Sequence, residues 1–214
     1  MPLHLPLWPR RGLYAITPDD ADTSRLLARV SLVLEAGASV LQYRNKAAGA
    51  ELRREQAEVL LQLCRAHGVP LIVNDDWRLA GEIGAHGAHL GGDDGDLRDA
   101  RRSLGDDAIL GASCYDDLDR ARRAADAGAS YVAFGAFHPS GTKPGARRAG
   151  IGLLRDSAAF DLPRVAIGGI TPANAGALIA AGADLIAVIG GLFDADDPHA
   201  AALAYLECFK DSHA

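Results

Sequence analysis

The amino-acid sequence predicts an α/β fold, a single-domain (β/α)8 TIM barrel. First, Ala- and Arg-rich helical stretches repeatedly end in Gly and lead into a short apolar run, as in EAGASVLQY and AAGADLIAVIG. Gly tolerates the left-handed conformation that ends many helices. Second, these runs are continuously apolar, which is typical of parallel strands with both faces buried. Third, 214 residues allow eight such units of roughly 27 residues, near the lower size limit of a barrel.

Each expected strand follows one of these helix ends or a turn. An open doubly wound sheet is the alternative, but the G-x-G-x-x-G element that would favour it is missing after the first strand. No linker or low-complexity segment divides the chain, so residues 1–214 are interpreted as one domain with residues 1–11 as an N-terminal extension. The expected strands are Leu13–Thr17, Ser39–Arg44, Leu71–Asp75, Ala88–Gly91, Ala108–Ser113, Tyr131–Gly135, Arg164–Gly168 and Leu185–Ile189.

Composition and charge exclude several classes of protein. The net charge is −6 and no basic stripe is present, which argues against a nucleic-acid partner. No run of 18 apolar residues could span a membrane. The opening MPLHLPLWPRRG has its basic pair after the apolar residues, the reverse of a secretory signal, so we expect a cytoplasmic chain. A homo-oligomer is left open.

The end of the second strand carries the strongest functional signal. Gln42, Arg44 and Lys46 alternate in LQYRNK, so a strand would point all three side chains to one face. Active sites of (β/α)8 barrels lie on the loops that follow the strands. Two cations and an amide, with Asn74 at the end of the next strand, therefore predict an anionic ligand. The alternative is a solvated edge strand.

Carboxylates follow the third and fourth strands. Asp75, Asp76, Asp93 and Asp94 would bring acidic oxygens to neighbouring strand ends. Oxygen ligands without Cys or His suit Mg²⁺, which binds one or two carboxylates together with water and phosphate oxygens. The alternative is helix capping, which would suffice for Asp76 or Asp96.

The loop after the sixth strand, FGAFHPSGTKPGARRAG, combines hydroxyls, an ammonium and several Gly and Pro residues. Ser140, Thr142 and Lys143 could bind a phosphate there, although the spacing is not that of a P-loop. A plain connecting loop is the alternative.

Glycine pairs follow the seventh and eighth strands, in AIGGITPAN and VIGGLF. Gly169, Gly190 and Gly191 would let a ligand approach the backbone closely, and these loops frequently bind phosphate in barrels. Two anion sites on one barrel mouth predict two phosphorylated small-molecule substrates, and so a transfer or a condensation.

Two further patterns limit the chemistry. No Glu lies at any expected strand end, which argues against a reaction led by a protein general base. His86 and His89 form H-x-x-H, but they belong to a predicted strand region and not to a helix, so we do not expect a zinc pair.

Taken together, the motifs LYAITPD, LQYRNK, LIVNDD, AHGAHLGGDD, LGASCYD, GASYVAFGAFHPSGTKPGA, VAIGGI and LIAVIGGLF resemble those of the thiamine phosphate synthase family. The resemblance covers nearly every strand end in order. It implies a Mg²⁺-dependent transferase of thiamine biosynthesis. In that reaction, 4-amino-2-methyl-5-hydroxymethylpyrimidine diphosphate condenses with hydroxyethylthiazole phosphate to give thiamine phosphate and pyrophosphate.

The resemblance also implies roles for particular residues. Asp75 and Asp94 match the Mg²⁺ ligands, and Gly169 matches a contact to the thiazole phosphate. Arg44, Lys143 and Ser113 would be catalytic. The residues that match the pyrimidine diphosphate and phosphate-loop positions are Gln42, Arg44, Lys46, Asn74, Ser113, Ser140, Thr142 and Lys143.

The sequence departs from the family pattern at three places, one of which is Ser140, which replaces the first Thr of the phosphate-loop motif. Gly190 and Gly191 stand where a Ser usually contacts the thiazole phosphate, and Gly92 replaces a common Gln. Two alternative functions therefore stay open. One is a thiazole tautomerase-like isomerase, which should lack the diphosphate and metal residues. The other is a non-catalytic barrel that binds a phosphorylated ligand.

Overall fold

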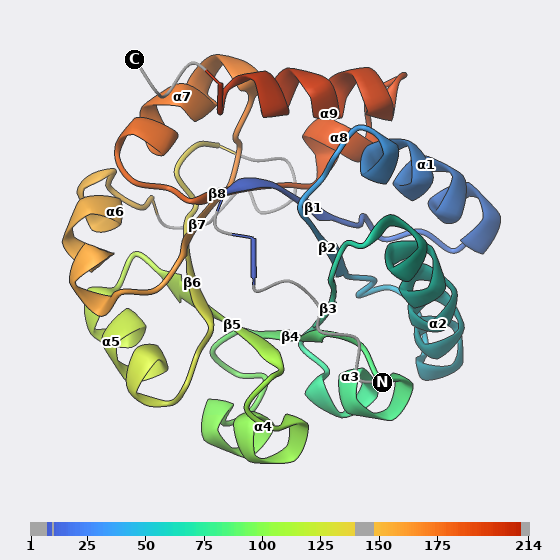
Figure 1. Cartoon of the computed structure of the whole chain (residues 1–214), viewed down its shortest axis with the longest axis horizontal. Helices are drawn as coiled ribbons and strands as arrows, with labels where there is room; N and C mark the ends of the chain where they lie inside the picture. The colour runs from blue at the N-terminus through green and yellow to red at the C-terminus, as the bar shows by residue number, and fades with distance from the viewer. Residues whose placement is uncertain (1–7, 10, 140–147, 211–214) are drawn as a thin grey trace.

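A computed structural model describes residues 8–9, 11–139 and 148–210. In these residues, eight parallel strands close into a barrel in chain order and helices surround it (Figure 1). The strands are β1 (Gly12–Ile16), β2 (Val40–Tyr43), β3 (Leu71–Asn74), β4 (Gly87–Leu90), β5 (Ile109–Tyr115), β6 (Tyr131–Phe134), β7 (Arg164–Ile167) and β8 (Leu185–Val188). The helices are α1 (Thr23–Glu35), α2 (Ala50–His67), α3 (Trp77–Ile83), α4 (Leu97–Leu104), α5 (Leu118–Asp126), α6 (Gly152–Asp156), the 3₁₀ turn η1 (Ser157–Phe160), α7 (Pro172–Ala180), α8 (Gly190–Phe193) and α9 (Pro198–Glu207).

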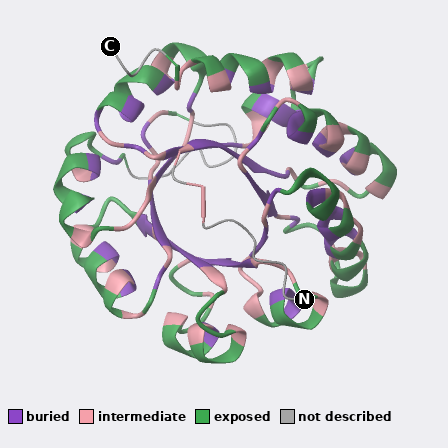
Figure 2. Cartoon of the chain, viewed as in Figure 1, coloured by how far each residue is buried: buried purple, intermediate pink, exposed green. Residues whose placement is uncertain are grey.

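The strands separate two apolar cores. Along β1, Leu13 and Ala15 pack in the large core under the helices, whereas Tyr14 and Ile16 pack in a smaller cluster inside the barrel. Figure 2 shows the ring of strands buried and the outer helix faces exposed. Because both strand faces are covered, the strands need apolar residues at successive positions. The predicted barrel is confirmed.

Helices end at the glycines that the sequence predicted. Gly68 ends α2 with φ 66°, and Gly37, Gly128 and Gly182 have φ values of 106°, 87° and 108°. Gly adopts such angles more easily than any residue with a side chain, which explains its recurrence between helix and strand. No helix in the described part of the chain has the length and apolar character needed to cross a membrane.

Several strand bounds differ from the predicted ones. β2 ends at Tyr43, one residue before the predicted end, because Arg44 already belongs to the loop. β5 continues to Tyr115, so the predicted end at Ser113 was wrong. A register shift between Ser113 and Tyr115 lets β5 keep pairing with β6 beyond that point. Ser113 is therefore a strand residue.

The predicted N-terminal extension precedes β1, which begins at Gly12; residues 1–7 and 10 lie outside the described residues. Trp8 is described and contacts the aromatic residues inside the barrel. Its ring stacks on Tyr131 with centroids 4.1 Å apart and planes at 11°, and meets Tyr14 edge-on at 5.9 Å. At least this residue of the extension is thus part of the packed structure.

Candidate active site

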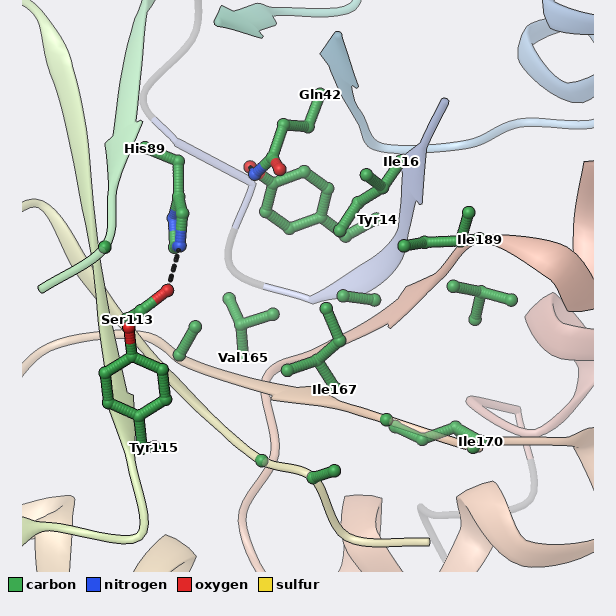
Figure 3. Close-up of a pocket in the computed structure, with 18 of the residues that line it drawn as sticks. Tyr14, Ile16, Gln42, His89, Ser113, Tyr115, Val165, Ile167, Ile170 and Ile189 are labelled. Carbon is green, nitrogen blue, oxygen red and sulfur yellow. Dashed lines mark hydrogen bonds between the residues drawn. The ribbon is translucent and has the colours of Figure 1, made fainter. Parts of the chain in front are cut away.

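A cavity of about 1560 Å³ opens where the strands end. Side chains that follow several strands line it, and part of this lining is drawn in Figure 3. Its position agrees with the rule that barrel active sites lie at the carboxyl ends of the strands. Of the residues predicted from the sequence, the lining contains Gln42, Arg44, Lys46, Asn74, Asp75, Asp94, Ser113, Gly169, Gly190 and Gly191.

The loop after β1 fixes the two cations that follow β2. The Thr17 hydroxyl accepts a hydrogen bond from the Arg44 backbone N–H and donates one to its carbonyl, both at 2.8 Å. Asp19 accepts from the Arg44 guanidinium at 3.1 Å and from the Lys46 backbone N–H at 2.6 Å. The Arg44 side chain is only 14% exposed. The cations are therefore positioned before any anion binds.

Asp75 and Asp94 form a carboxyl pair beside Lys46. The Lys46 ammonium lies 2.9 Å from Asp75 Oδ2, and the two carboxyl groups are close enough to shift each other's pKa. Asp75 has φ 63°, in the left-handed region that Asp tolerates better than most residues. The Gly91 N–H donates to Asp94 Oδ2 at 2.8 Å. Both carboxyl groups are thus oriented by their own backbone surroundings.

This pairing shifts the two pKa values in opposite directions. Burial raises the pKa of Asp75, but hydrogen bonds from Lys46 and Asp94 outweigh burial and hold it below its ordinary value. Burial, followed by the hydrogen bond with Asp75, raises the pKa of Asp94 above its ordinary value. Two neighbouring carboxyl groups supply the oxygen ligands that a hard divalent cation prefers.

The other acidic candidates have different surroundings. Asp76 caps α3 by accepting from the Leu79 N–H at 2.9 Å, and Asp96 caps α4 by accepting from the Arg98 N–H at 2.6 Å. Asp93 is exposed and does not line the cavity. Within the described ranges, no group of three or more His, Cys, Asp or Glu residues could hold a metal. A cation at Asp75 and Asp94 would therefore need further oxygen ligands from substrate and water.

A chain of hydrogen bonds crosses the barrel interior below the cavity mouth. Gln42 Nε2 donates to the Tyr14 hydroxyl at 2.8 Å, and that hydroxyl lies 2.7 Å from the Tyr131 hydroxyl. Tyr131 is 2.9 Å from His89 Nδ1, and His89 Nε2 is 2.9 Å from Ser113 Oγ. Figure 3 shows His89 pointing at Ser113. Two predicted site residues, Gln42 and Ser113, are thus connected through three that were not predicted.

The glycines after β7 and β8 differ in what a side chain at each position would contact. Gly169 has φ 61°, and a Cβ there would lie 2.1 Å from the Pro139 carbonyl oxygen, so the position requires Gly. A Cβ at Gly190 would lie 2.5 Å from a carboxylate oxygen of Asp194, and one at Gly191 would lie 2.2 Å from the Tyr205 hydroxyl. Neighbouring side chains therefore occupy the space that a Ser at these positions would use.

Ser140, Thr142 and Lys143, predicted for the phosphate loop, lie outside the described residues. Sequence reasoning missed Asp19, Tyr14, Tyr131 and His89. His89 was considered only as half of a zinc pair, whereas it lies within β4 and faces Ser113. Buried Tyr and His residues within otherwise aliphatic strands were the available signal, because their polar atoms need partners when buried.

Comparison with known proteins agrees with this geometry. A family model described as thiamine monophosphate synthase matches residues 13–192. The chain is 59% identical over 193 residues to a thiamine-phosphate synthase of Chromobacterium violaceum, covering 90% of this chain and 93% of that protein. It is 58% identical over 195 residues to one of Xanthomonas campestris pv. campestris, covering 91% and 94%.

Among solved structures, a thiamine phosphate pyrophosphorylase from Pyrococcus furiosus superposes with a TM-score of 0.85 at 31% identity. The superposition covers 96% of this chain and 98% of that one. The match therefore includes the barrel as well as the sequence motifs. The chain belongs to the thiamine monophosphate synthase family and is a transferase.

Proposed function

We propose that the protein joins 4-amino-2-methyl-5-hydroxymethylpyrimidine diphosphate to hydroxyethylthiazole phosphate, giving thiamine phosphate and pyrophosphate. The observation that carries this proposal is the grouping of Arg44, Lys46, Asp75 and Asp94 at one cavity mouth. A diphosphate needs cations around it, and a divalent metal ion needs carboxylates, so the same corner of the cavity suits both.

The donor set fits Mg²⁺. Asp75 and Asp94 supply two adjacent carboxyl groups, and a cation bound between them would relieve the like-charge repulsion that contributes to the raised pKa of Asp94. Bound there, Mg²⁺ would offset the negative charge that develops on a departing diphosphate. Lys46, 2.9 Å from Asp75, is placed to bind a diphosphate oxygen beside the metal.

The chain's own residues favour cleavage of the C–O bond before the new bond forms. Arg44 is held by Asp19 and needs little reorganisation as charge builds up on the leaving group. Loss of pyrophosphate leaves a pyrimidine cation that its own amino group stabilises, and the thiazole nitrogen then attacks it. This route transfers few protons, which agrees with strand ends that carry no Glu. Lys143, on the resemblance, would add a further cation.

The test is to mix the protein with both substrates and Mg²⁺ and to follow thiamine phosphate and pyrophosphate together. We expect both products in equal amounts, and neither when EDTA is added. Isomerisation of a thiazole substrate without pyrophosphate release would instead indicate the tautomerase-like alternative. Saturable binding of either phosphate without turnover would indicate a non-catalytic barrel.

A further inference from the structure

We propose that Tyr14, Tyr131 and His89 are positioning residues that fix which groups at the substrate site donate and which accept hydrogen bonds. The inference rests on the proposed function for its substrate, because it concerns recognition of the heterocycle. It rests on the structure for the hydrogen-bond chain, which runs from Gln42 on β2 to Ser113 on β5.

The direction of the hydrogen-bond chain follows from Gln42, its first member. The Gln42 amide nitrogen can only donate, so the Tyr14 hydroxyl accepts from it. The buried Tyr14 hydroxyl proton needs an acceptor, and among the hydrogen bonds that Tyr14 makes only the Tyr131 hydroxyl can accept from it. Tyr131 then gives its single proton to His89 Nδ1. His89 then carries its proton on Nε2 and donates it to Ser113 Oγ.

The two ends of the hydrogen-bond chain consequently differ at the cavity: one end can accept a hydrogen bond from a ligand and the other can donate one. Gln42 directs its nitrogen to Tyr14, which leaves its carbonyl oxygen available to accept from a ligand. Ser113 Oγ accepts from His89, which leaves the Ser113 hydroxyl proton available to donate. The site therefore fits a planar heterocycle with an N–H donor toward β2 and a ring-nitrogen acceptor toward β5. An aminopyrimidine carries both groups.

Burial makes this arrangement hard to reverse. Tyr14 and Tyr131 are 1% and 0% exposed, and Gln42 is 3% exposed, so water cannot replace a missing partner at small cost. Trp8 stacks on Tyr131 and helps to hold it. If the Tyr131–His89 end ran the other way, Tyr14 would accept from both Gln42 and Tyr131, and its own buried proton would be left without an acceptor.

The first test uses the protein without substrates, so its outcome does not depend on the proposed function. In ¹⁵N-His-labelled protein at about pH 8.5, where an ordinary imidazole is neutral, we expect His89 as the Nε2–H tautomer. His89→Asn assigns the signal. Tyr131→Phe keeps the ring under Trp8 and removes the central hydroxyl, so it should shift the His89 signals toward a mixture of tautomers. An Nδ1–H tautomer in the unmodified protein would show that the chain runs the other way and would overturn the proposal.

The second test uses turnover. Tyr131→Phe should lower kcat/KM for the pyrimidine diphosphate by about tenfold, the value of one lost buried hydrogen bond. The matched control is Tyr43→Phe, which removes the buried hydroxyl that donates to Gln56 at 2.9 Å on the outer face of β2. We expect that control to stay within twofold. Equal losses in both variants would mean a structural effect only and would reject a positioning role.

A double variant separates positioning from general destabilisation. Because Tyr131 is proposed to act partly through Ser113, Tyr131→Phe should cause a smaller loss in a Ser113→Ala background than in the unmodified protein. Additive losses would contradict the proposal even if both single variants are impaired. If the unmodified protein makes no thiamine phosphate, the proposed function fails, and the tautomer measurement still decides whether the chain has the inferred direction.

Discussion

At the residue scale, Arg44 is the cation whose position is most closely determined. Its backbone is bound by Thr17 and its guanidinium by Asp19, and its side chain is largely buried at the cavity mouth. We predict that Arg44→Ala lowers kcat/KM about 100-fold, mostly through kcat, because the charge it stabilises grows as the leaving group departs. Steady-state assays with each substrate varied in turn would measure this.

The matched control for Arg44 is Arg25→Ala. Arg25 is 61% exposed on α1, pairs with Asp20 and does not line the cavity. The Arg25→Ala substitution removes the same charge as Arg44→Ala, and we expect its kcat/KM to stay within twofold of that of the unmodified protein. If Arg44→Ala retained near-normal kcat/KM, the assignment of Arg44 to the leaving diphosphate would be wrong. The resemblance predicts a similar loss for Lys143→Ala.

At the element scale, the loop between β7 and α7 depends on a glycine. A methyl group at Gly169 would meet the backbone of Pro139 and His138, and the φ of 61° would add strain. Gly169→Ala should therefore cost about 2–3 kcal/mol of stability. It should also raise KM for the thiazole phosphate at least several-fold, since the loop would move away from the cavity. Thermal unfolding and steady-state kinetics would measure the two effects.

Gly176→Ala is the control for the loop. Gly176 lies within α7, and apart from the adjoining helix backbone no atom would lie within 4 Å of a methyl group at this position. Replacing it should stabilise the protein by about 0.5–1 kcal/mol, because Ala is the better helix former. Similar destabilisation by both substitutions would show that α7, and not the strained loop, is the sensitive element.

The N-terminal extension contributes an aromatic layer to the barrel interior. We predict that Trp8→Ala lowers the free energy of unfolding by about 2 kcal/mol, less than for a fully buried Trp because Trp8 is half-buried. Urea unfolding would measure it. Trp8→Phe keeps a stacked ring and removes an indole N–H that has no hydrogen-bond partner among the described residues, so it should lose less. Equal losses would contradict stacking as the cause.

At the scale of the whole molecule, the fold could be predicted because its signals are repetitive. Gly after most helices that precede a strand and continuously apolar strands recur around the barrel, so an error of one residue at the end of β2 does not change the predicted fold. The cavity lining could be predicted from residues at strand ends, such as Asp75 and Lys46. The chain through Tyr14, Tyr131 and His89 could not, because these residues are far apart in sequence and meet only when the barrel closes.

Metal binding should appear as a change in the stability of the whole protein. Mg²⁺ that binds only the folded state at ten times its Kd adds about 1.4 kcal/mol, a rise in Tm of roughly 3 °C for a chain of this size. Thermal unfolding with Mg²⁺ and with EDTA would measure it. The Asp94→Asn variant should lose this rise, whereas Asp93→Asn, a neighbouring exposed carboxylate outside the cavity, should keep it.

The same experiment has a pH dependence with a definite sign. The folded protein raises the pKa of Asp94, so this carboxyl favours folding when it is protonated. Without metal, its contribution is present at low pH and is lost as the pH rises through the raised pKa. Mg²⁺ must displace that proton, so the increase in Tm should be full at neutral pH and shrink as the pH falls through that range.

When no metal is present, Asp94→Asn should change the stability of the protein relative to the unmodified protein, and the size of this change should depend on pH. Asn can still accept from the Gly91 N–H and can donate to Asp75 without adding a negative charge. The variant in EDTA should therefore be more stable than the unmodified protein at neutral pH, and equally stable at a pH low enough to protonate Asp94. If the variant were less stable at neutral pH, the Asp94 carboxylate would stabilise the folded protein. That result would contradict the view that the carboxyl pair destabilises the protein when no metal is bound.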